Sequence, residues 1–288
     1  MPVTLDTNPI GVFDSGIGGL SVANAVSGLL PRESLLYVAD NAYAPYGPRP
    51  AAEILERSRR LTAWLLARGA KLIVVACNTA TSVAIDALRA QYRGLPFVGL
   101  EPAVKPASQA TRVGVLATRA TLASERYRTL RAAYFGDRPV IEDSCAGLVP
   151  LIEAEGAGGP GVKARLAEIL APMTAASVDT LVLGCTHYPL VAADITGLCG
   201  PDVRLIDPSP AAARQVERLL VGHGLTYPAA SSLVGTRARA QTADNRETDA
   251  PPVHAFYATG AAGPLQRTLL RLPDLNRHRK WVVPRLVV

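Results

Sequence analysis

Short apolar runs alternate with helix-like stretches along most of this chain, and that rhythm constrains its fold more than any other feature. Runs of this length suit buried strands, whereas the stretches between them have the apolar spacing of helices. A chain that repeats strand and helix builds parallel sheets with helices on both faces. Strands are expected at 10–13, 35–39, 72–76, 97–100, 113–116, 181–183, 203–206 and 253–258, with a short run at Val140, and helices at 20–30, 51–67, 80–91, 122–134, 211–220 and 265–272.

Three features of the first half recur in the second half in the same order, which indicates a duplication. The matched pairs are Val12–Asp14 with Val115–Ala117, Cys77 with Cys185, and 100–102 with 206–208. Chance similarity among generic strand ends is the alternative. A chain of 288 residues is long enough for two related α/β units.

The last part of the chain has a weaker pattern. The helix at 211–220 and the strand at 253–258 suit a chain that returns to the first unit. Residues 226–249 are rich in Ser, Thr, Arg and Ala and are expected to be irregular. The apolar end, 281–288, is expected to form a short strand or a packing tail.

Composition and charge narrow the class of protein. Apolar residues make up 49% of the chain, which is enough for a core and excludes a disordered protein. No apolar run reaches the length of a membrane span, and Met1–Pro9 lacks the pattern of an export signal, so a cytoplasmic protein is expected. The net charge of +6 is scattered, and its densest group, Arg57, Arg59 and Arg60, suits the solvated face of a helix. Nucleic-acid binding is therefore not favoured.

Two cysteines stand where a predicted strand ends and polar residues follow. Cys77 precedes Asn78 and Thr79, and Cys185 precedes Thr186 and His187. Ligands of open α/β sheets bind at the carboxyl ends of strands, and a helix N-terminus there favours a thiolate. The alternative is that both are buried core residues, which is what we expect of the other two cysteines, Cys145 and Cys199.

The cysteine spacing does not predict a metal site. Cys185 and His187 are two residues apart, and the chain has neither a Cys-x-x-Cys pair nor a His-x-x-x-His pair. The expected compartment also disfavours a stable disulfide.

The turn after the first strand, Asp14–Gly19, is rich in glycine and opens a helix. It resembles a dinucleotide fingerprint, with Asp40 at about the ribose-binding spacing. The match is poor because Ser21 replaces the third glycine and Asp14 would repel a pyrophosphate. Asp14 is better suited to orient or protonate a neighbouring base, or to cap the helix.

Other polar residues follow predicted strands. The stiff loop 44–49 offers the Tyr46 hydroxyl and the Gly47 N–H to a carboxylate, or is an ordinary turn. Thr118 and Thr121 are hydroxyl donors or only helix caps. Glu153, before a glycine-rich turn, has the pattern of a surface acid.

Four segments taken together resemble the aspartate/glutamate racemase family, and within it the glutamate racemases. They are Gly11-Val-Phe-Asp-Ser-Gly-Ile-Gly-Gly-Leu20, Ala44-Pro-Tyr-Gly47, Ala76-Cys-Asn-Thr79 and Gly184-Cys-Thr-His-Tyr-Pro189. The resemblance runs from about residue 10 to about residue 220, with an echo at Phe256-Tyr-Ala-Thr-Gly260, and is weakest over 226–288.

The resemblance implies a fold as well as an activity. It implies two pseudo-related α/β domains, each a mainly parallel sheet flanked by helices, with the active site in the cleft between them. The first would comprise residues 1–100 and 211–288, and the second residues 101–210. The activity implied is cofactor-independent interconversion of L- and D-glutamate, an isomerase reaction that supplies D-glutamate for peptidoglycan precursors and so for cell wall biogenesis and cell shape. Neither a metal nor pyridoxal phosphate is implied.

Residue roles carry over by position. Cys77 would take the α-proton of D-glutamate and Cys185 that of L-glutamate, assisted by Asp14, His187 and, less directly, Glu153. The implied substrate-binding residues are Asp14, Ser15, Tyr46, Gly47, Asn78, Thr79, Thr118, Thr186 and His187.

The chemistry suits these residues, because inverting an α-carbon needs a base on one face and an acid on the other. One thiolate and one thiol, each from a different unit, meet that need. The alternatives left open are an aspartate or hydantoin racemase or a related decarboxylase, an NAD-dependent enzyme, and a nucleic-acid-associated binding role through the basic surface. The sequence also leaves open whether the protein is a monomer or a homodimer.

Overall fold

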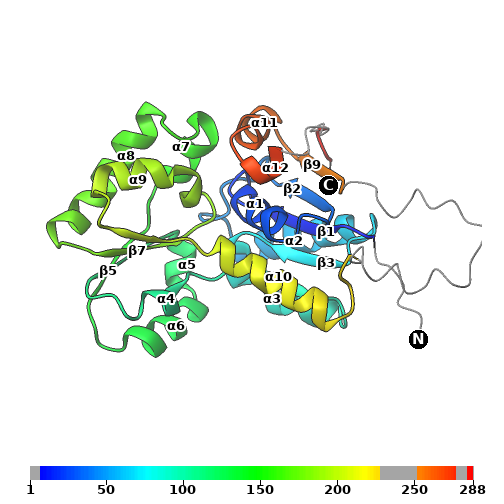
Figure 1. The fold of residues 1–288 in the computed structure, drawn as a ribbon, viewed down its shortest axis with the longest axis horizontal. Coiled ribbons are helices and arrows are strands. Elements are labelled where there is room, and N and C mark those ends of the chain that lie inside the picture. Colours follow the sequence, from blue (N-terminus) through cyan, green and yellow to red (C-terminus); the bar gives the residue numbers. More distant parts are fainter. Residues whose placement is uncertain (1–6, 228–251, 277–283, 288) are drawn as a thin grey trace, which may run out of the picture.

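The structure, a computed structural model, describes residues 7–227, 252–276 and 284–287. It has two lobes, one on either side of Figure 1, and each is built on its own sheet. Every strand pairing within the two sheets is parallel. The α/β class expected from the sequence, with mainly parallel sheets flanked by helices, is therefore confirmed.

The first lobe contains a five-stranded sheet in the order β4-β3-β1-β2-β9. Its strands are β1 (Ile10–Asp14), β2 (Leu35–Ala39), β3 (Leu72–Val75), β4 (Phe97–Gly99) and β9 (His254–Ala258). The late strand β9 lies beside β2, so the chain returns to this sheet as the sequence predicted. An isolated bridge from Ala258 to Arg285 extends the return.

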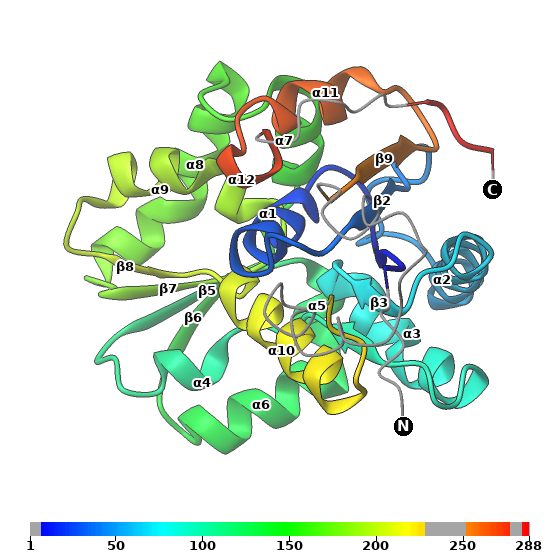
Figure 2. The ribbon, with the colours of Figure 1, turned by 45° about the vertical axis from the view of Figure 1, so that its right-hand side comes forward.

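Helices cover both faces of the first sheet because alternate strand residues are apolar on both sides. On one face, α1 (Leu20–Leu29) and α10 (Ser209–Gly222) pack on side chains such as Val12 and Val74. On the other face, α2 (Ala51–Leu66) and α3 (Asn78–Gln91) pack on side chains such as Phe13 and Val75. The short helices α11 (Gly263–Leu269) and α12 (Pro273–Asn276) follow β9, and Figure 2 shows α12 close to α1.

The second lobe contains a four-stranded sheet in the order β6-β5-β7-β8. Its strands are β5 (Val113–Ala117), β6 (Val140–Asp143), β7 (Thr180–Gly184) and β8 (Arg204–Ile206). Packed on one face are α7 (Leu148–Glu155), α8 (Pro160–Ala175) and α9 (Ala192–Cys199). On the other face lie α4 (Val104–Ala107) and α6 (Glu125–Phe135), with α5 (Arg119–Ala123) before α6 and the 3-10 helix η1 (Tyr188–Val191) after β7.

The two sheets have equivalent topologies, which supports the duplication inferred from the sequence. The order β4-β3-β1-β2 in the first lobe corresponds to β8-β7-β5-β6 in the second. Under this correspondence β3, which precedes Cys77, matches β7, which precedes Cys185. The two cysteines therefore occupy the same position in two copies of one unit.

Most predicted elements agree with the structure to within one or two residues, and the differences have local causes. The helix expected at 122–134 is two helices, because Ser124 caps α6 by accepting a hydrogen bond from Tyr127 N. The sequence reading missed α7, α8 and α9 altogether. Residues 228–249 of the segment expected to be irregular, and 281–283 and 288 of the expected tail, lie outside the described residues.

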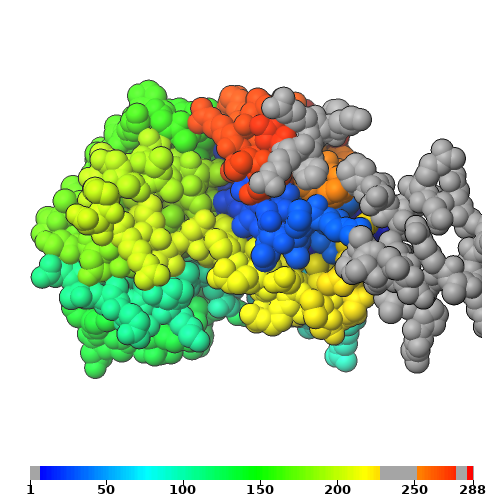
Figure 3. Space-filling view, in the orientation of Figure 1, coloured from blue at the N-terminus to red at the C-terminus, as the bar shows by residue number. Residues whose placement is uncertain are grey.

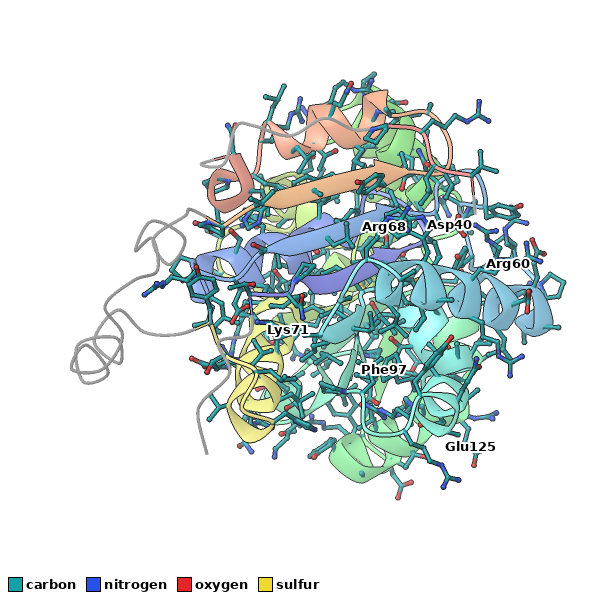
Figure 4. All side chains as sticks on the ribbon, turned by 90° about the vertical axis from the view of Figure 1, so that its right-hand side faces the viewer. Asp40, Arg60, Arg68, Lys71, Phe97 and Glu125 are labelled. Atoms are coloured by element: carbon teal, nitrogen blue, oxygen red, sulfur yellow. The ribbon has the colours of Figure 1, made fainter. Side chains whose placement is uncertain are left out.

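The described helices include none that is long and apolar enough to cross a membrane. The division into domains 1–100 with 211–288 and 101–210 stays a prediction. Two groups mark opposite ends of the first sheet in Figure 4: Lys71 lies at the amino end of β3, and Asp40 lies at the carboxyl end of β2. Polar residues of the candidate site gather at the carboxyl end.

Candidate active site

Cys77 and Cys185 line one cavity between the lobes. Cys77 follows β3 and is the N-cap of α3, where its Sγ accepts a hydrogen bond from Ala80 N at 3.5 Å. Cys185 follows β7 and precedes η1. Both side chains are buried. The cavity has a volume of about 20 Å³ and is lined by Ser15, Pro45, Tyr46, Gly47, Cys77, Asn78, Thr79, Thr118, Val149, Cys185, Thr186 and His187.

The surroundings of Cys77 favour its thiol form. Its Sγ lies 3.8 Å from Ser15 Oγ. Burial raises the pKa of the Cys77 thiol well above its ordinary value, and the negative charge of Asp14 raises it further, whereas the Ala80 N–H lowers it. Burial also raises the pKa of Asp14 itself, against the opposing effect of His187. Cys77 is thus expected to rest as the thiol, although the sequence pattern indicated that the helix N-terminus would favour a thiolate, because burial outweighs the Ala80 N–H.

Cys185 belongs to a chain of three titratable side chains. Its Sγ lies 3.8 Å from His187 Nδ1, and His187 Nε2 lies 2.7 Å from Glu153 Oε1. Burial lowers the pKa of His187, but the hydrogen bonds and charges of Cys185 and Glu153 more than reverse this, so the pKa stands well above its ordinary value. The raised pKa favours the imidazolium form of His187 beside the sulfur.

Glu153 is not the plain surface acid that its sequence pattern indicated. Its side chain is only 15% exposed, and Oε1 also accepts a hydrogen bond from Ile17 N of the first lobe at 2.8 Å. The carboxylate therefore joins the two lobes while it holds His187.

Glycines of the β1–α1 turn allow the lobes to approach this closely. A Cβ at Gly16 would lie 1.8 Å from Glu153 Oε1, and one at Gly18 would lie 2.3 Å from His187 Nδ1. Asp14 accepts hydrogen bonds from Gly16 N, Gly19 N and the Thr186 hydroxyl. The glycine-rich turn thus packs against the second lobe, which argues against the dinucleotide alternative.

The acid of that alternative is also unavailable, because Asp40 is fully buried and pairs with Arg57. The expectation that Arg57 lies on a solvated helix face is wrong: it is buried, whereas Arg59 and Arg60 of the same helix are exposed. Arg57 lies on the face of α2 that packs on the sheet, beside Ile54 and Leu61.

The remaining predicted residues lie at the cavity in different roles. The Tyr46 hydroxyl donates to Asp40 Oδ2 at 2.5 Å, so the donor that the sequence analysis assigned to a carboxylate ligand is used within the protein. Thr118 is the N-cap of α5, and its hydroxyl also lies 3.0 Å from that of Thr79 across the lobes. Both amide atoms of Asn78 are buried without a hydrogen-bond partner in the described part of the chain, which leaves them available to a ligand.

The other two cysteines and a second cavity lie outside the candidate site. Cys145 is buried among apolar residues as expected, whereas Cys199, at the end of α9, is only partly buried. Among the described residues, there is no group of three or more His, Cys, Asp or Glu side chains that could hold a metal ion. A second, larger cavity of about 360 Å³ lies between α7 and α11. Glu153, which holds His187 of the active site, is one of the residues that line it. Figure 3 shows the α11–α12 segment against the α7–α8 segment on this face.

Sequence reasoning missed the main-chain contacts that close the site, namely those of Ile17 N and of Gly16 and Gly18 with the second lobe. No pattern along the chain reports a contact between residues this far apart. Helix α8 was within reach, because Pro160 follows Gly159 at its start and Val162, Leu166, Ile169 and Met173 recur at helical spacing.

Comparisons with known proteins agree with this arrangement. The profile of the Asp/Glu/Hydantoin racemase family matches residues 20–216. The chain is 49% identical over 220 residues to a glutamate racemase of Cupriavidus pinatubonensis, which covers 75% of this chain and 80% of the relative.

Solved structures that align over almost the whole chain are also similar. A glutamate racemase of Escherichia coli in complex with L-glutamate and an activator matches with a TM-score of 0.76 and 30% identity, over 98% of this chain and 100% of that one. A glutamate racemase of Francisella tularensis in complex with D-glutamate matches with a TM-score of 0.76 and 28% identity, over 98% of both chains.

Proposed function

The chain belongs to the Asp/Glu/Hydantoin racemase family and is an isomerase with glutamate racemase activity, and we propose that it works by proton transfer between Cys77 and Cys185. The observation that carries the proposal is that the two cysteines, one from each lobe, line the same cavity. The similar glutamate racemases of Escherichia coli and Francisella tularensis are in complex with L-glutamate and D-glutamate, respectively. The same two ligands are the substrates proposed here.

The reaction needs two groups because a planar intermediate must lose a proton on one face and gain one on the other. We propose that the Cys185 thiolate removes the α-proton of L-glutamate and that the Cys77 thiol protonates the opposite face, giving D-glutamate. In the reverse direction Cys77 is the base and Cys185 is the acid. Each direction moves one proton to sulfur and one from sulfur, so the charge of the site is unchanged.

The neighbours of each sulfur suit these roles. The negative charge of Asp14 and the burial of Cys77 favour the thiol that must donate. The imidazolium of His187, held by Glu153, compensates the negative charge of a thiolate at Cys185. Asp14 and His187 are therefore proposed as assisting residues, with Glu153 acting through His187.

Substrate binding is proposed to use the polar groups that line the cavity. Because Cys77 caps α3, the first N–H groups of that helix point toward the site and can bind a carboxylate. Such donors also stabilise the negative charge that develops when the α-proton leaves. The proposed binding residues are Asp14, Ser15, Tyr46 through its main chain, Gly47, Asn78, Thr79, Thr118, Thr186 and His187.

The cavity is smaller than the substrate, so the two lobes must separate to admit it. A volume of about 20 Å³ holds little more than one water molecule. We propose that residues 1–100 with 211–288 and residues 101–210 are the two domains that move. The helix α10, at the start of the return, packs on α1 of the first lobe, which supports this division.

The proposed activity is tested with circular dichroism on a panel of amino acids. Starting from either enantiomer of glutamate, the signal should decay to zero without added cofactor and at the same rate after dialysis against a chelator. Activity on aspartate alone, or on neither enantiomer of glutamate, would contradict the assignment. The product D-glutamate is proposed to enter peptidoglycan precursors.

A further inference from the structure

The Tyr46–Gly47 segment forms one wall of the active-site cavity, and its position depends on groups outside that cavity. Tyr46 is almost completely buried, and a Cβ at Gly47 would lie 3.6 Å from Thr118 Cβ of the second lobe. The wall therefore stands where the two lobes meet. A small displacement of it would change the space and the N–H groups offered to the substrate.

Asp40 binds the Tyr46 hydroxyl on the side of this wall that faces away from the cavity. It is fully buried, and its Oδ2 accepts hydrogen bonds from the Tyr46 hydroxyl at 2.5 Å and from Arg57 Nε at 2.9 Å. Its Oδ1 accepts from Arg57 Nη2 at 2.8 Å and from the Thr259 hydroxyl at 2.8 Å. Four charge-assisted hydrogen bonds thus fix one carboxylate that does not line the active-site cavity.

The partners of Asp40 come from three separate parts of the fold. Arg57 lies on α2 and also stacks on the Tyr43 ring, with its Cζ 3.9 Å from the ring centroid. Thr259 directly follows β9, the strand that the end of the chain adds to the first sheet. Its hydroxyl also accepts a hydrogen bond from Ala42 N. The returning chain is therefore connected to the Tyr46 hydroxyl through the carboxylate of Asp40, and it also contacts Asn41 and Ala42 at the start of the same loop.

Resting on the function proposed above, we infer that Asp40, Arg57 and Thr259 are positioning residues for the Tyr46–Gly47 wall, and that the Tyr46 hydroxyl serves Asp40 rather than the substrate. The cluster sets how tightly the site closes on glutamate. It also gives a physical reason for the sequence echo at Phe256–Gly260: the threonine of that motif anchors the wall of an active site it does not line.

The inference is tested by a double-mutant cycle on racemisation of glutamate with Tyr46→Phe, Thr259→Val and the pair. Each single variant should raise KM between about twofold and tenfold with little change in kcat, because the lost hydrogen bond lies outside the cavity and affects the substrate only through the position of the wall. Because both changes act through Asp40, the double variant should resemble the weaker-binding single variant rather than the product of the two effects. Thr259→Ser, which keeps the hydroxyl, should restore the KM.

A matched control is Thr62→Val. Thr62 is fully buried on α2, and its hydroxyl has no hydrogen-bond partner among the residues the structure describes, so this variant should leave KM and kcat unchanged. If either single variant fails to fold, Arg57→Lys takes its place in the cycle, because lysine keeps the charge but not the paired N–H groups.

An unchanged KM in Thr259→Val would overturn the inference, and so would effects of the two variants that multiply, since a Tyr46 hydroxyl that binds substrate directly is independent of Thr259. A loss of melting temperature without any change in KM would show that the cluster is only structural. Failure of the wild-type protein to racemise glutamate would instead contradict the proposed function.

Discussion

The two cysteines occupy equivalent positions in two copies of one α/β unit, yet their surroundings differ. Cys77 caps the long helix α3, and its pKa is raised first by burial and then by the negative charge of Asp14. Cys185 precedes only the short helix η1 and has the His187–Glu153 pair beside it. The backbone placement is duplicated, but the groups that control the protons are not.

This difference shows how a pseudo-symmetric scaffold can handle a nearly symmetric reaction. L- and D-glutamate have equal free energies, so the ratio kcat/KM must be the same in both directions whatever the neighbours are. The asymmetry of the neighbours can therefore change kcat and KM only together in each direction, and it sets the protonation state in which the free site rests. Here it favours a thiol at Cys77 and an imidazolium beside Cys185.

The largest effect is expected when either sulfur is removed. Cys77→Ser and Cys185→Ser should each lower kcat/KM by at least about 10³-fold, because a serine hydroxyl is far too weak an acid and base for this proton transfer. The loss should be equal from L- and from D-glutamate, as measured by circular dichroism.

Cys199→Ser is the matched control, since Cys199 lies at the end of α9 and should leave activity unchanged. Melting temperatures close to that of the wild type would show that the active-site variants are folded. Substantial turnover by either of them would contradict the two-cysteine scheme.

A smaller but still large effect is expected from Gly18→Ala. The added Cβ would lie 2.3 Å from His187 Nδ1, so the imidazole must move away from Cys185. A displacement of this size should reduce kcat/KM by about 10²-fold. Gly197→Ala on α9 meets nothing within 4 Å and should retain full activity. Equal activity in the two variants would mean that the contact between the lobes is not needed.

An intermediate effect is expected on the pH profile. The pKa of His187 is raised, so its imidazolium persists above the ordinary value near 6.5 and is lost as the pH rises through the raised value. The ratio kcat/KM should therefore fall on the basic side. Glu153→Gln removes one cause of the shift and should move this limb to lower pH, whereas Glu125→Gln, at an exposed position on α6, should not. If the basic limb of the kcat/KM profile stays at the same pH in Glu153→Gln, Glu153 does not control the protonation of His187 beside Cys185.

The smallest effect is expected from Thr118→Val. This change removes a hydroxyl that lies 3.0 Å from that of Thr79 and that caps α5. Loss of the cap should lower stability by about 1 kcal/mol, and loss of the contact across the lobes should raise KM several-fold without changing kcat. Thermal melts and initial rates measure the two effects. A large fall in kcat would place Thr118 in the proton transfer itself.

The strand ends of both lobes could be predicted because they depend on local patterns. The central strands end at Asp14, Val75, Ala117 and Gly184, and a polar residue lies within three positions after each of these ends. Parallel strands bring their carboxyl ends to the same edge of a sheet. The positions of Cys77 and Cys185 at one edge of each lobe follow from the sequence for this reason.

The surroundings of those residues could not be predicted, because burial of a charged side chain depends on contacts that the chain order does not report. Arg57 and Arg60 are three residues apart on one helix, but only Arg57 faces Asp40. Glu153 lies in the short helix α7, which the pattern did not reveal, and its role depends on a turn near the start of the chain.

Turnover of L-glutamate in deuterium oxide tests the central claim of two bases on opposite faces most directly. With the reaction stopped early, mass spectrometry of the separated enantiomers should find one deuterium at the α-carbon of D-glutamate and none in the remaining L-glutamate. D-Glutamate that keeps its protium, or deuterium that enters both enantiomers equally from the start, would contradict a proton exchange between Cys77 and Cys185 on either side of one carbon.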